Sequence, residues 1–140
     1  MDKHLVVIAG PTASGKTSTA IKVAQALGTV IISADSRQFY KEIPIGTAAP
    51  TKQELSKVQH YMIHNLSVED DYNVADYEHD VLNLLNKLFL EHDTVVLTGG
   101  SGLFIDAVCN GIDFMPDISD ENRESVKKLY QNGGLQALQE

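Results

Sequence analysis

Eight residues near the N-terminus have the types and the spacing of a loop that binds phosphate groups. They read Gly-Pro-Thr-Ala-Ser-Gly-Lys-Thr and fit the pattern G-x-x-x-x-G-K-[ST]. In such a loop the glycines let the backbone wrap around an anion with its N–H groups inward, Lys16 adds a positive charge, and Thr17 offers a hydroxyl to Mg²⁺. The pattern predicts a binding site for a di- or triphosphate, formed by Gly10, Pro11, Thr12, Ala13, Ser14, Gly15, Lys16 and Thr17.

The residues on either side of this loop favour the same interpretation. An apolar run over residues 5–9 precedes the loop, as a strand would, and an apolar pattern at helical spacing leads from Thr17 to Leu27. A chance match in a glycine-containing turn would not be expected between a strand and a helix. We therefore predict a phosphate-binding loop at this position.

Two further turns carry residues suited to chemistry. Residues 33–38, Ser-Ala-Asp-Ser-Arg-Gln, follow the second predicted strand, and residues 99–102, Gly-Gly-Ser-Gly, follow the fourth. Ligands bind outside the carboxyl ends of parallel strands, so we expect both turns to share one crevice with the phosphate loop. In that crevice three roles are open to Asp35, namely a Mg²⁺ ligand, a general base, or a cap of its own turn.

The pattern of apolar residues predicts alternating strands and helices. A strand without polar alternation, such as 94–98, is expected where helices cover both faces of a sheet. Residues 51–54, Thr-Lys-Gln-Glu, form a capping box that favours the start of a helix. The expected order is a strand over 4–9, a helix over 17–27, a strand over 29–33, a long loop to about 50, a helix over 51–58, a strand over 60–66, a helix over 74–89, a strand over 94–98 and a helix that stops at Gly111.

We therefore predict an α/β protein with a P-loop NTPase-like parallel sheet, helices on both faces of that sheet, and the start of a helical insertion after it. Residues 1–111 are expected to form the core and residues 112–140 to open the insertion. A helix is expected from about Ser119 to Gly133–Gly134, and another begins at Leu135. This last pattern has one turn and no cap before residue 140, so we expect the N-terminal part of a longer protein, with its insertion truncated.

The net charge of −8 is unevenly distributed along the 140 residues. Residues 1–64 hold seven Lys and Arg against four Asp and Glu, a net of +3, whereas residues 65–140 hold four against fifteen, a net of −11. Because binding a phosphate backbone requires Lys and Arg, this balance argues against nucleic-acid binding by the chain as a whole.

Without a membrane span or a signal peptide, a cytoplasmic protein is expected. Cys109, the only cysteine, is expected to be a small buried residue without a chemical role.

Five segments together resemble one enzyme family. They are GPTASGKT at 10–17, SADSRQFY at 33–40, IGTAAP at 45–50, YNVADYEHD at 72–80 and LTGGSGLFIDAVCNGI at 97–112. Their order and spacing are similar to those of the tRNA dimethylallyltransferases, also called tRNA isopentenyltransferases. The phosphate loop occurs in many enzymes, but the later segments are specific, and the chain resembles the N-terminal part of a bacterial member.

The resemblance implies transfer of a dimethylallyl group from dimethylallyl diphosphate to the exocyclic N6 of the adenosine beside the tRNA anticodon, with release of pyrophosphate. Lys16, the loop N–H groups and a Mg²⁺ ion held through Thr17 would stabilise the departing pyrophosphate. Asp35 matches the general base of the family. The implied partners are dimethylallyl diphosphate and tRNA, and we expect a monomer. The residues implied to contact tRNA are Asp35, Ser36, Arg37, Gln38, Ser101 and Arg123.

Some positions depart from the family pattern. Ala49 stands where Lys is common, and Ile63-His64 stands where Ile-Asp is common. His60 and His64 are four residues apart, but no third metal ligand accompanies them. We expect both histidines to be ordinary strand or loop residues.

Other functions stay open on the residues alone. A P-loop kinase of a nucleotide or small metabolite would share the first strand, loop and helix. Such kinases gather several arginines over the phosphoryl group, however, and this chain has only Arg37 and Arg123. Prenyl transfer to free AMP and a non-catalytic pyrophosphate-binding module are the further alternatives.

Overall fold

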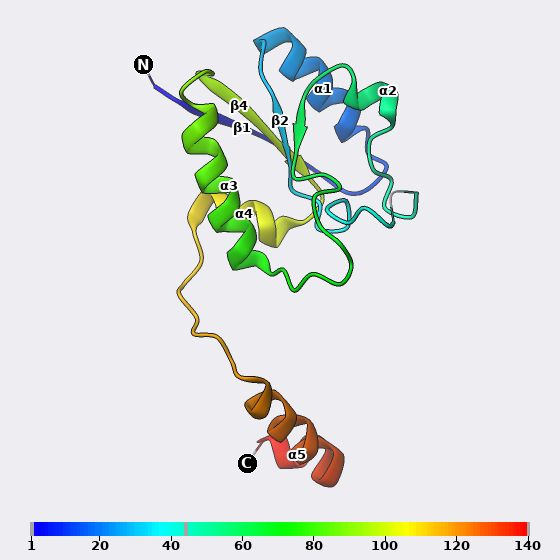
Figure 1. Ribbon diagram of the computed structural model, residues 1–140, viewed down its shortest axis with the longest axis vertical. Helices are drawn as coiled ribbons and strands as arrows, with labels where there is room; N and C mark the ends of the chain where they lie inside the picture. Colours follow the sequence, from blue (N-terminus) through cyan, green and yellow to red (C-terminus); the bar gives the residue numbers. More distant parts are fainter. Residues whose placement is uncertain (1, 44, 140) are drawn as a thin grey trace.

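The computed structural model describes residues 2–43 and 45–139. Within these residues the core is a four-stranded sheet of β1 (His4–Ala9), β2 (Ile31–Ser33), β3 (His60–Tyr61) and β4 (Thr94–Gly99) (Figure 1). The strand order is β1-β4-β2-β3, and each pairing is parallel. The predicted parallel sheet is confirmed.

The strand order places β4 between the two strands that carry the predicted chemistry. β4 pairs with β1 along its whole length, and the last pair joins Ala9 to Gly99. On its other side, Thr98 is paired with Ser33 at the end of β2. Three strands therefore end side by side at one edge of the sheet.

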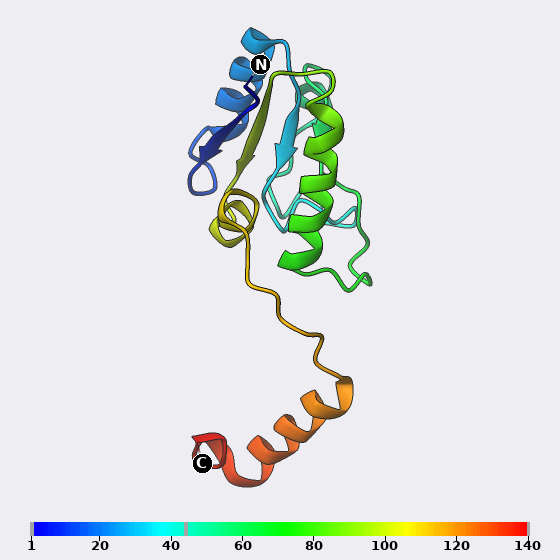
Figure 2. The ribbon, with the colours of Figure 1, turned by 90° about the vertical axis from the view of Figure 1, so that its left-hand side faces the viewer.

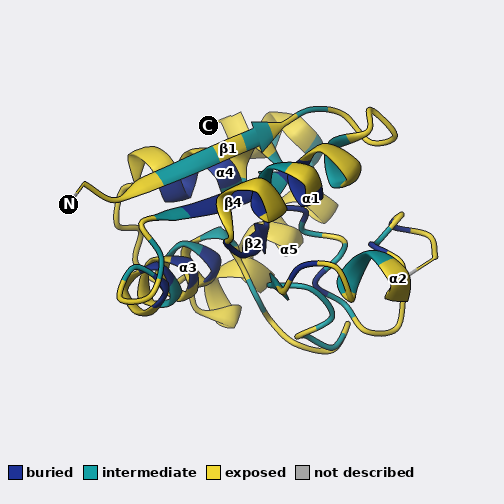
Figure 3. Ribbon diagram, turned by 90° about the horizontal axis from the view of Figure 1, so that it is seen from above, coloured by how far each residue is buried: buried dark blue, intermediate teal, exposed yellow. Residues whose placement is uncertain are grey.

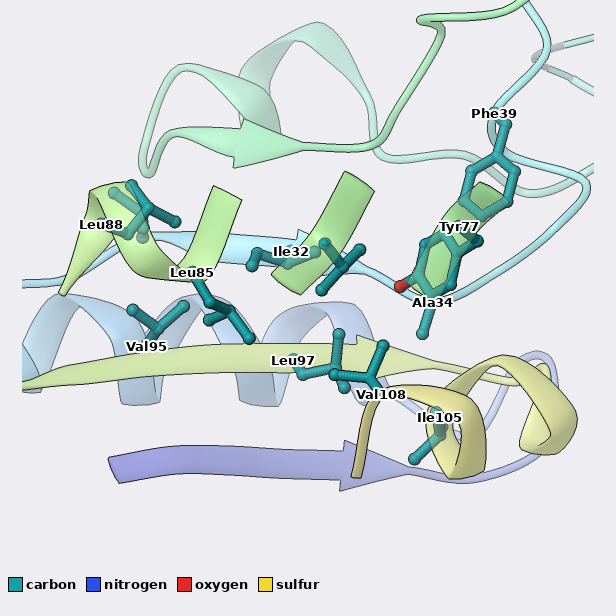
Figure 4. Close-up of a cluster of buried hydrophobic side chains, with 12 residues drawn as sticks. Ile32, Ala34, Phe39, Tyr77, Leu85, Leu88, Val95, Leu97, Ile105 and Val108 are labelled. Atoms are coloured by element: carbon teal, nitrogen blue, oxygen red, sulfur yellow. The ribbon is translucent and has the colours of Figure 1, made fainter. Parts of the chain in front are cut away.

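Helices cover both faces of the sheet, as predicted. α1 (Lys16–Leu27) lies on one face, and α3 (Val74–Leu88) and α4 (Gly102–Asn110) lie on the other (Figure 2). Val96 packs with α1, whereas its neighbours Val95 and Leu97 pack with α3 and α4 (Figure 4). Because both faces are covered, the middle of β4 is fully buried (Figure 3) and its sequence shows no polar alternation.

Local signals set the ends of α1 and α3. α1 starts after Gly15, at φ 85°, and is ended by Gly28, at φ 62°, and both values lie in the left-handed region that favours glycine. Before α3, Asn73 Oδ1 accepts hydrogen bonds from the N–H groups of Ala75 and Asp76 at 2.8 and 3.1 Å. These two helices form where the sequence predicts them.

The helix α2 (Lys52–Leu55) starts as predicted but ends early. Its capping box is present, since the Glu54 N–H donates to Thr51 Oγ1 at 3.2 Å and the Thr51 N–H donates to Glu54 Oε2 at 2.8 Å. The helix stops after one turn, where the Lys57 N–H donates to the carbonyl of Glu54 at 3.1 Å, three residues back, instead of continuing the four-residue spacing of an α-helix.

The prediction of a strand over residues 60–66 is wrong in its second half. Met62 and His64 have φ values of 59° and 50°, which interrupt an extended backbone. The chain turns instead toward the loop after β2, where the His64 N–H donates to the carbonyl of Gln38 at 2.9 Å. The residues after β3 thereby support the loop that carries Asp35.

Beyond Gly111 the chain leaves the sheet. Figures 1 and 2 show an extended segment that leads to α5 (Asp120–Gln139), which lies apart from the core. None of its described residues is buried, and Gly134 interrupts the helix with φ 63° and ψ −158°, close to the predicted break. Among the described residues, neither α5 nor another helix is long and apolar enough to cross a membrane. The boundary between a core and an insertion at residue 111 stays a prediction.

Cys109 is exposed, so the prediction that it is buried is wrong. The buried side of α4 is formed by Ile105, Ala107 and Val108. Successive residues of a helix are rotated by about 100°, so the side chain of Cys109 lies outside the buried face that ends with Val108.

Gly99 leaves no room for a side chain where β4 ends. A Cβ atom there would lie 2.2 Å from the carbonyl oxygen of Ala34. We expect Gly99→Ala to lower the free energy of unfolding by about 2 kcal/mol or more, because the two strand backbones would have to separate.

Gly102→Ala is the matched control, since a Cβ atom at Gly102 meets no atom within 4 Å and alanine favours the helix that starts there. Urea unfolding of both variants measures the difference. Equal unfolding midpoints would contradict the importance of the close approach at Gly99.

Candidate functional site

A cavity of about 260 Å³ lies where β1, β2 and β4 end. The three turns predicted to converge all line it, together with residues from the loop before α2 and from the region around β3. The lining residues are Thr12, Ala13, Gly15, Lys16, Thr17 and Ser18 from the first turn, Ser33, Asp35 and Gln38 from the second, Thr98 and Gly99 from the third, and Ala48, Pro50, Glu54, His60 and Ile63. The predicted convergence is confirmed.

The phosphate loop is curved and held from within. Ala13 and Gly15 have φ values of 63° and 85°. The carbonyl of Pro11 accepts hydrogen bonds from Ser14 Oγ at 2.7 Å and from Lys16 Nζ at 2.5 Å. Because α1 begins directly after the loop, the unpaired N–H groups of its first turn lie at the cavity, next to the Lys16 ammonium group. This arrangement suits an anion.

Asp35 is the buried acid of the cavity, with 5% of its surface exposed. The preceding residue extends the sheet, since the Ala34 N–H donates to the carbonyl of Thr98 at 2.7 Å. Asp35 Oδ1 accepts a hydrogen bond from the Arg37 N–H at 3.2 Å, which is the turn-capping role. Asp35 also lines the cavity. Its carboxylate can therefore cap the turn and still reach a molecule bound in the cavity.

Arg37 connects the turn of Asp35 with the phosphate loop. Its Nη2 donates to Thr12 Oγ1 at 3.0 Å, and its Nε lies 3.7 Å from Asp35 Oδ1. The Arg37 side chain is 57% exposed, so this ion pair contributes little to stability. The two contacts place the guanidinium group of Arg37 beside both the phosphate loop and the buried carboxylate of Asp35.

Gly100 lies between the phosphate loop and Asp35. A Cβ atom on Gly100 would lie 3.4 Å from the carbonyl oxygen of Gly10, 3.9 Å from Lys16 Nζ and 3.8 Å from Asp35 Oδ2. The absence of a side chain at Gly100 thus leaves the ammonium group and the carboxylate facing one small space.

Ser101 joins the second and third turns. Its N–H donates to the carbonyl of Ala34 at 3.1 Å, and its Oγ accepts a hydrogen bond from the Ser36 N–H at 3.0 Å. The two serine hydroxyl oxygens lie 3.2 Å apart. The hydroxyl that the resemblance assigns to tRNA contact therefore also holds the turn of Asp35.

Gln38 holds the loop before α2 against the cavity. Its Nε2 donates to the carbonyls of Thr47 and Ala48 at 3.3 and 3.2 Å. This loop and β3 complete the cavity wall, with lining residues that the sequence analysis did not assign to the site. The strand predicted from residue 60 onward is the signal that could have found His60 and Ile63, because a strand parallel to β2 ends at the same edge of the sheet.

His60 is one of these additional wall residues. Burial lowers the pKa of its imidazole, because the charged ring is poorly solvated there. Its Nδ1 lies 2.8 Å from the carbonyl of Val58, so Nδ1 is the donor. The neutral ring then keeps Nε2 as a hydrogen-bond acceptor.

Arg123 is not brought to the cavity. It belongs to α5, which lies apart from the core in Figures 1 and 2, and its side chain is exposed. Its implied contact with tRNA stays a prediction.

Comparison with known proteins points to a single family. The family model described as IPP transferase matches residues 38–140. The chain is 46% identical to tRNA dimethylallyltransferase 1 of Phocaeicola vulgatus over 138 residues, which cover 99% of this chain and 46% of the relative. The predicted resemblance is confirmed.

Solved structures show the same likeness. The tRNA isopentenylpyrophosphate transferase of Bacillus halodurans matches with a TM-score of 0.76 and 30% identity, over 99% of this chain and 46% of that one. The tRNA delta(2)-isopentenylpyrophosphate transferase of Staphylococcus epidermidis matches with a TM-score of 0.74 and 31% identity, over 94% and 42%. The predicted fold class is confirmed, and the chain spans a little under half the length of these relatives.

The phosphate loop is expected to bind pyrophosphate in this chain, because its donors all lie within one short segment. Lys16→Ala should weaken that binding by about tenfold or more, the usual effect of losing a hydrogen bond to a charged group. Titration calorimetry measures the dissociation constant. Lys22→Ala, which removes an exposed lysine from the same helix, is the control. Equal affinities of Lys16→Ala and the unaltered chain for pyrophosphate would show that the phosphate loop is not the binding site.

Proposed function

The chain belongs to the IPP transferase family, and from this premise we propose that the protein transfers a dimethylallyl group from dimethylallyl diphosphate to N6 of the adenosine beside the tRNA anticodon. The proposal covers an activity of the whole protein, whose relatives are about twice as long as this chain. A cytoplasmic location and a monomeric state belong to the same proposal.

One observation carries the proposal, namely an anion site and a buried acid in the same cavity. Lys16, the first turn of α1 and Asp35 line this cavity, and Lys16 Nζ and the Asp35 carboxylate lie close to the same point beside Gly100. Prenyl transfer needs both groups, because a diphosphate must depart while a proton leaves the attacking amine. A module that only bound pyrophosphate would need the turn-capping role of Asp35 but no proton acceptor in the cavity.

The proposed reaction forms a bond between adenine N6 and the allylic carbon as the bond from that carbon to the diphosphate oxygen breaks. The electron pair of the broken bond departs with pyrophosphate, where Lys16 and the loop N–H groups stabilise the negative charge. The carboxylate of Asp35 accepts the proton released from N6. An adenine amine is a poor nucleophile, so removal of this proton assists attack.

We also propose that Mg²⁺ binds through Thr17. Thr17 lines the cavity as the last residue of the phosphate loop, and hydroxyl and phosphate oxygens are the hard donors that this ion prefers. A bound Mg²⁺ would neutralise part of the charge on the diphosphate.

The residues proposed to contact tRNA are Asp35, Ser36, Arg37, Gln38, Ser101 and Arg123. Arg37 supports this proposal most directly, because it is more than half exposed while it contacts both the phosphate loop and the turn of Asp35. Residues 65–140 carry a net charge of −11, so the cationic surface that tRNA binding needs is expected mainly elsewhere in the whole protein.

Asp35→Asn is expected to lower the rate of the chemical step by about 10²- to 10⁴-fold, the usual effect of losing a general base. Donor and tRNA binding should change little, because an amide has nearly the same shape as a carboxyl group. Single-turnover measurements with the full-length protein at saturating substrates test this. Asp106→Asn, at an exposed position on α4, is the control. An unchanged rate for Asp35→Asn would leave Asp35 with the capping role alone.

The identity of the acceptor is tested by supplying tRNA, AMP or ATP together with dimethylallyl diphosphate. We expect the full-length protein to modify tRNA alone and the 140-residue chain to modify none of the three, because this chain lacks a broad cationic surface. Prenylated AMP would indicate the sibling reaction instead. Modification of tRNA by the 140-residue chain at the rate of the full-length protein would overturn the proposed division of labour.

A further inference from the structure

A cluster of aromatic rings lies beneath the loop that carries Asp35. Tyr77 of α3 stacks on Phe39, with ring centroids 5.3 Å apart and an angle of 19° between the planes (Figure 4). Phe104 of α4 meets Tyr77 edge-on at 4.9 Å, and Tyr72 meets Phe39 edge-on at 6.0 Å. Tyr77 and Phe39 are almost completely buried, so these contacts are closed to water.

Tyr77 contacts both ends of the segment that carries the site residues. Its hydroxyl donates to the carbonyl of Ser33 at 2.7 Å, where β2 ends. Its ring stacks on Phe39, six residues later. Between these two points lie Asp35 and three of the residues proposed to contact tRNA, namely Ser36, Arg37 and Gln38. A single buried side chain thus fixes where this segment starts and where it ends.

The hydroxyl and the ring of Tyr77 act at different ends of the segment. Burial raises the pKa of the Tyr77 hydroxyl far above its usual range, so it remains protonated and able to donate. The Ser33 carbonyl that accepts this hydrogen bond lies two residues before Asp35, at the point where the backbone leaves the sheet. A shift of this carbonyl would turn the following peptide groups and move the carboxylate.

We propose that Tyr77 is a positioning residue, which orients the carboxylate of Asp35 by holding Ser33 and Phe39 at the two ends of the intervening segment. This inference rests on the proposed function for its effect on the reaction, whereas its structural part concerns the 33–39 segment alone. Tyr77 lies outside the cavity lining and touches no reacting atom, so it acts through Asp35.

Tyr77→Phe separates the hydroxyl from the ring, because it keeps the stacking on Phe39 and removes only the hydrogen bond to Ser33. Tyr72→Phe is the matched control, since Tyr72 also contacts Phe39 but donates its hydroxyl to Asp80, at 2.9 Å. The measurements are the single-turnover rate of the full-length protein at saturating substrates, the dissociation constant for pyrophosphate, and amide hydrogen exchange.

We expect Tyr77→Phe to slow the chemical step by about tenfold, from the loss of a buried hydrogen bond next to the base. The dissociation constant for pyrophosphate should change less than about twofold, because the phosphate loop is built from its own local contacts. Amide exchange should accelerate in residues 34–40 and stay unchanged in β1 and the second half of α3. Tyr72→Phe should resemble the unaltered protein in all three measurements.

An unchanged rate together with unchanged exchange in residues 34–40 would overturn the proposal. A uniform acceleration of exchange throughout the core would also overturn it, since Tyr77 would then be a structural residue only. If the unaltered protein transfers no prenyl group, the proposed function fails, and the exchange measurement still decides whether Tyr77 holds the 33–39 segment.

Discussion

The backbones of β2 and β4 approach each other at Ala34 and Gly99 so closely that no side chain fits between them. Two hydrogen bonds fasten the approach, from the Ala34 N–H to Thr98 and from the Ser101 N–H to Ala34. Because β4 also pairs with β1, this contact sets the distance between the phosphate loop and the turn of Asp35. The three turns form one cavity only while this central strand holds its two neighbours in register.

The charges in the cavity explain how an acidic chain can offer a site for an anion. The attraction comes from Lys16, from the N–H groups of the phosphate loop and the first turn of α1, and from Arg37 beside the loop, and it falls off over a short distance. The excess of acidic residues belongs to residues 65–140, outside the segment that forms the phosphate loop. The carboxylate of Asp35 lies beside the same space, where it could accept a proton.

Much of the fold could be predicted because it follows from local rules. β1, α1 and α3 form where the apolar periodicity and the capping residues place them, and the left-handed backbone at Gly15 and Gly28 bounds α1. The phosphate loop and the capping box of α2 are likewise complete within a few consecutive residues. The convergence of three turns required only the additional rule that parallel strands end at a common edge.

The sequence by itself determined the type of fold, the phosphate loop and the candidate acid, because each depends on neighbours a few positions away along the chain. Only the tertiary structure decided what surrounds them. The early end of β3, the wall residue His60, the exposure of Cys109 and the contact between Tyr77 and Ser33 join segments far apart in the sequence or depend on which helix face the sheet covers. Such contacts are selected by the packing of the whole core, so no local pattern contains them.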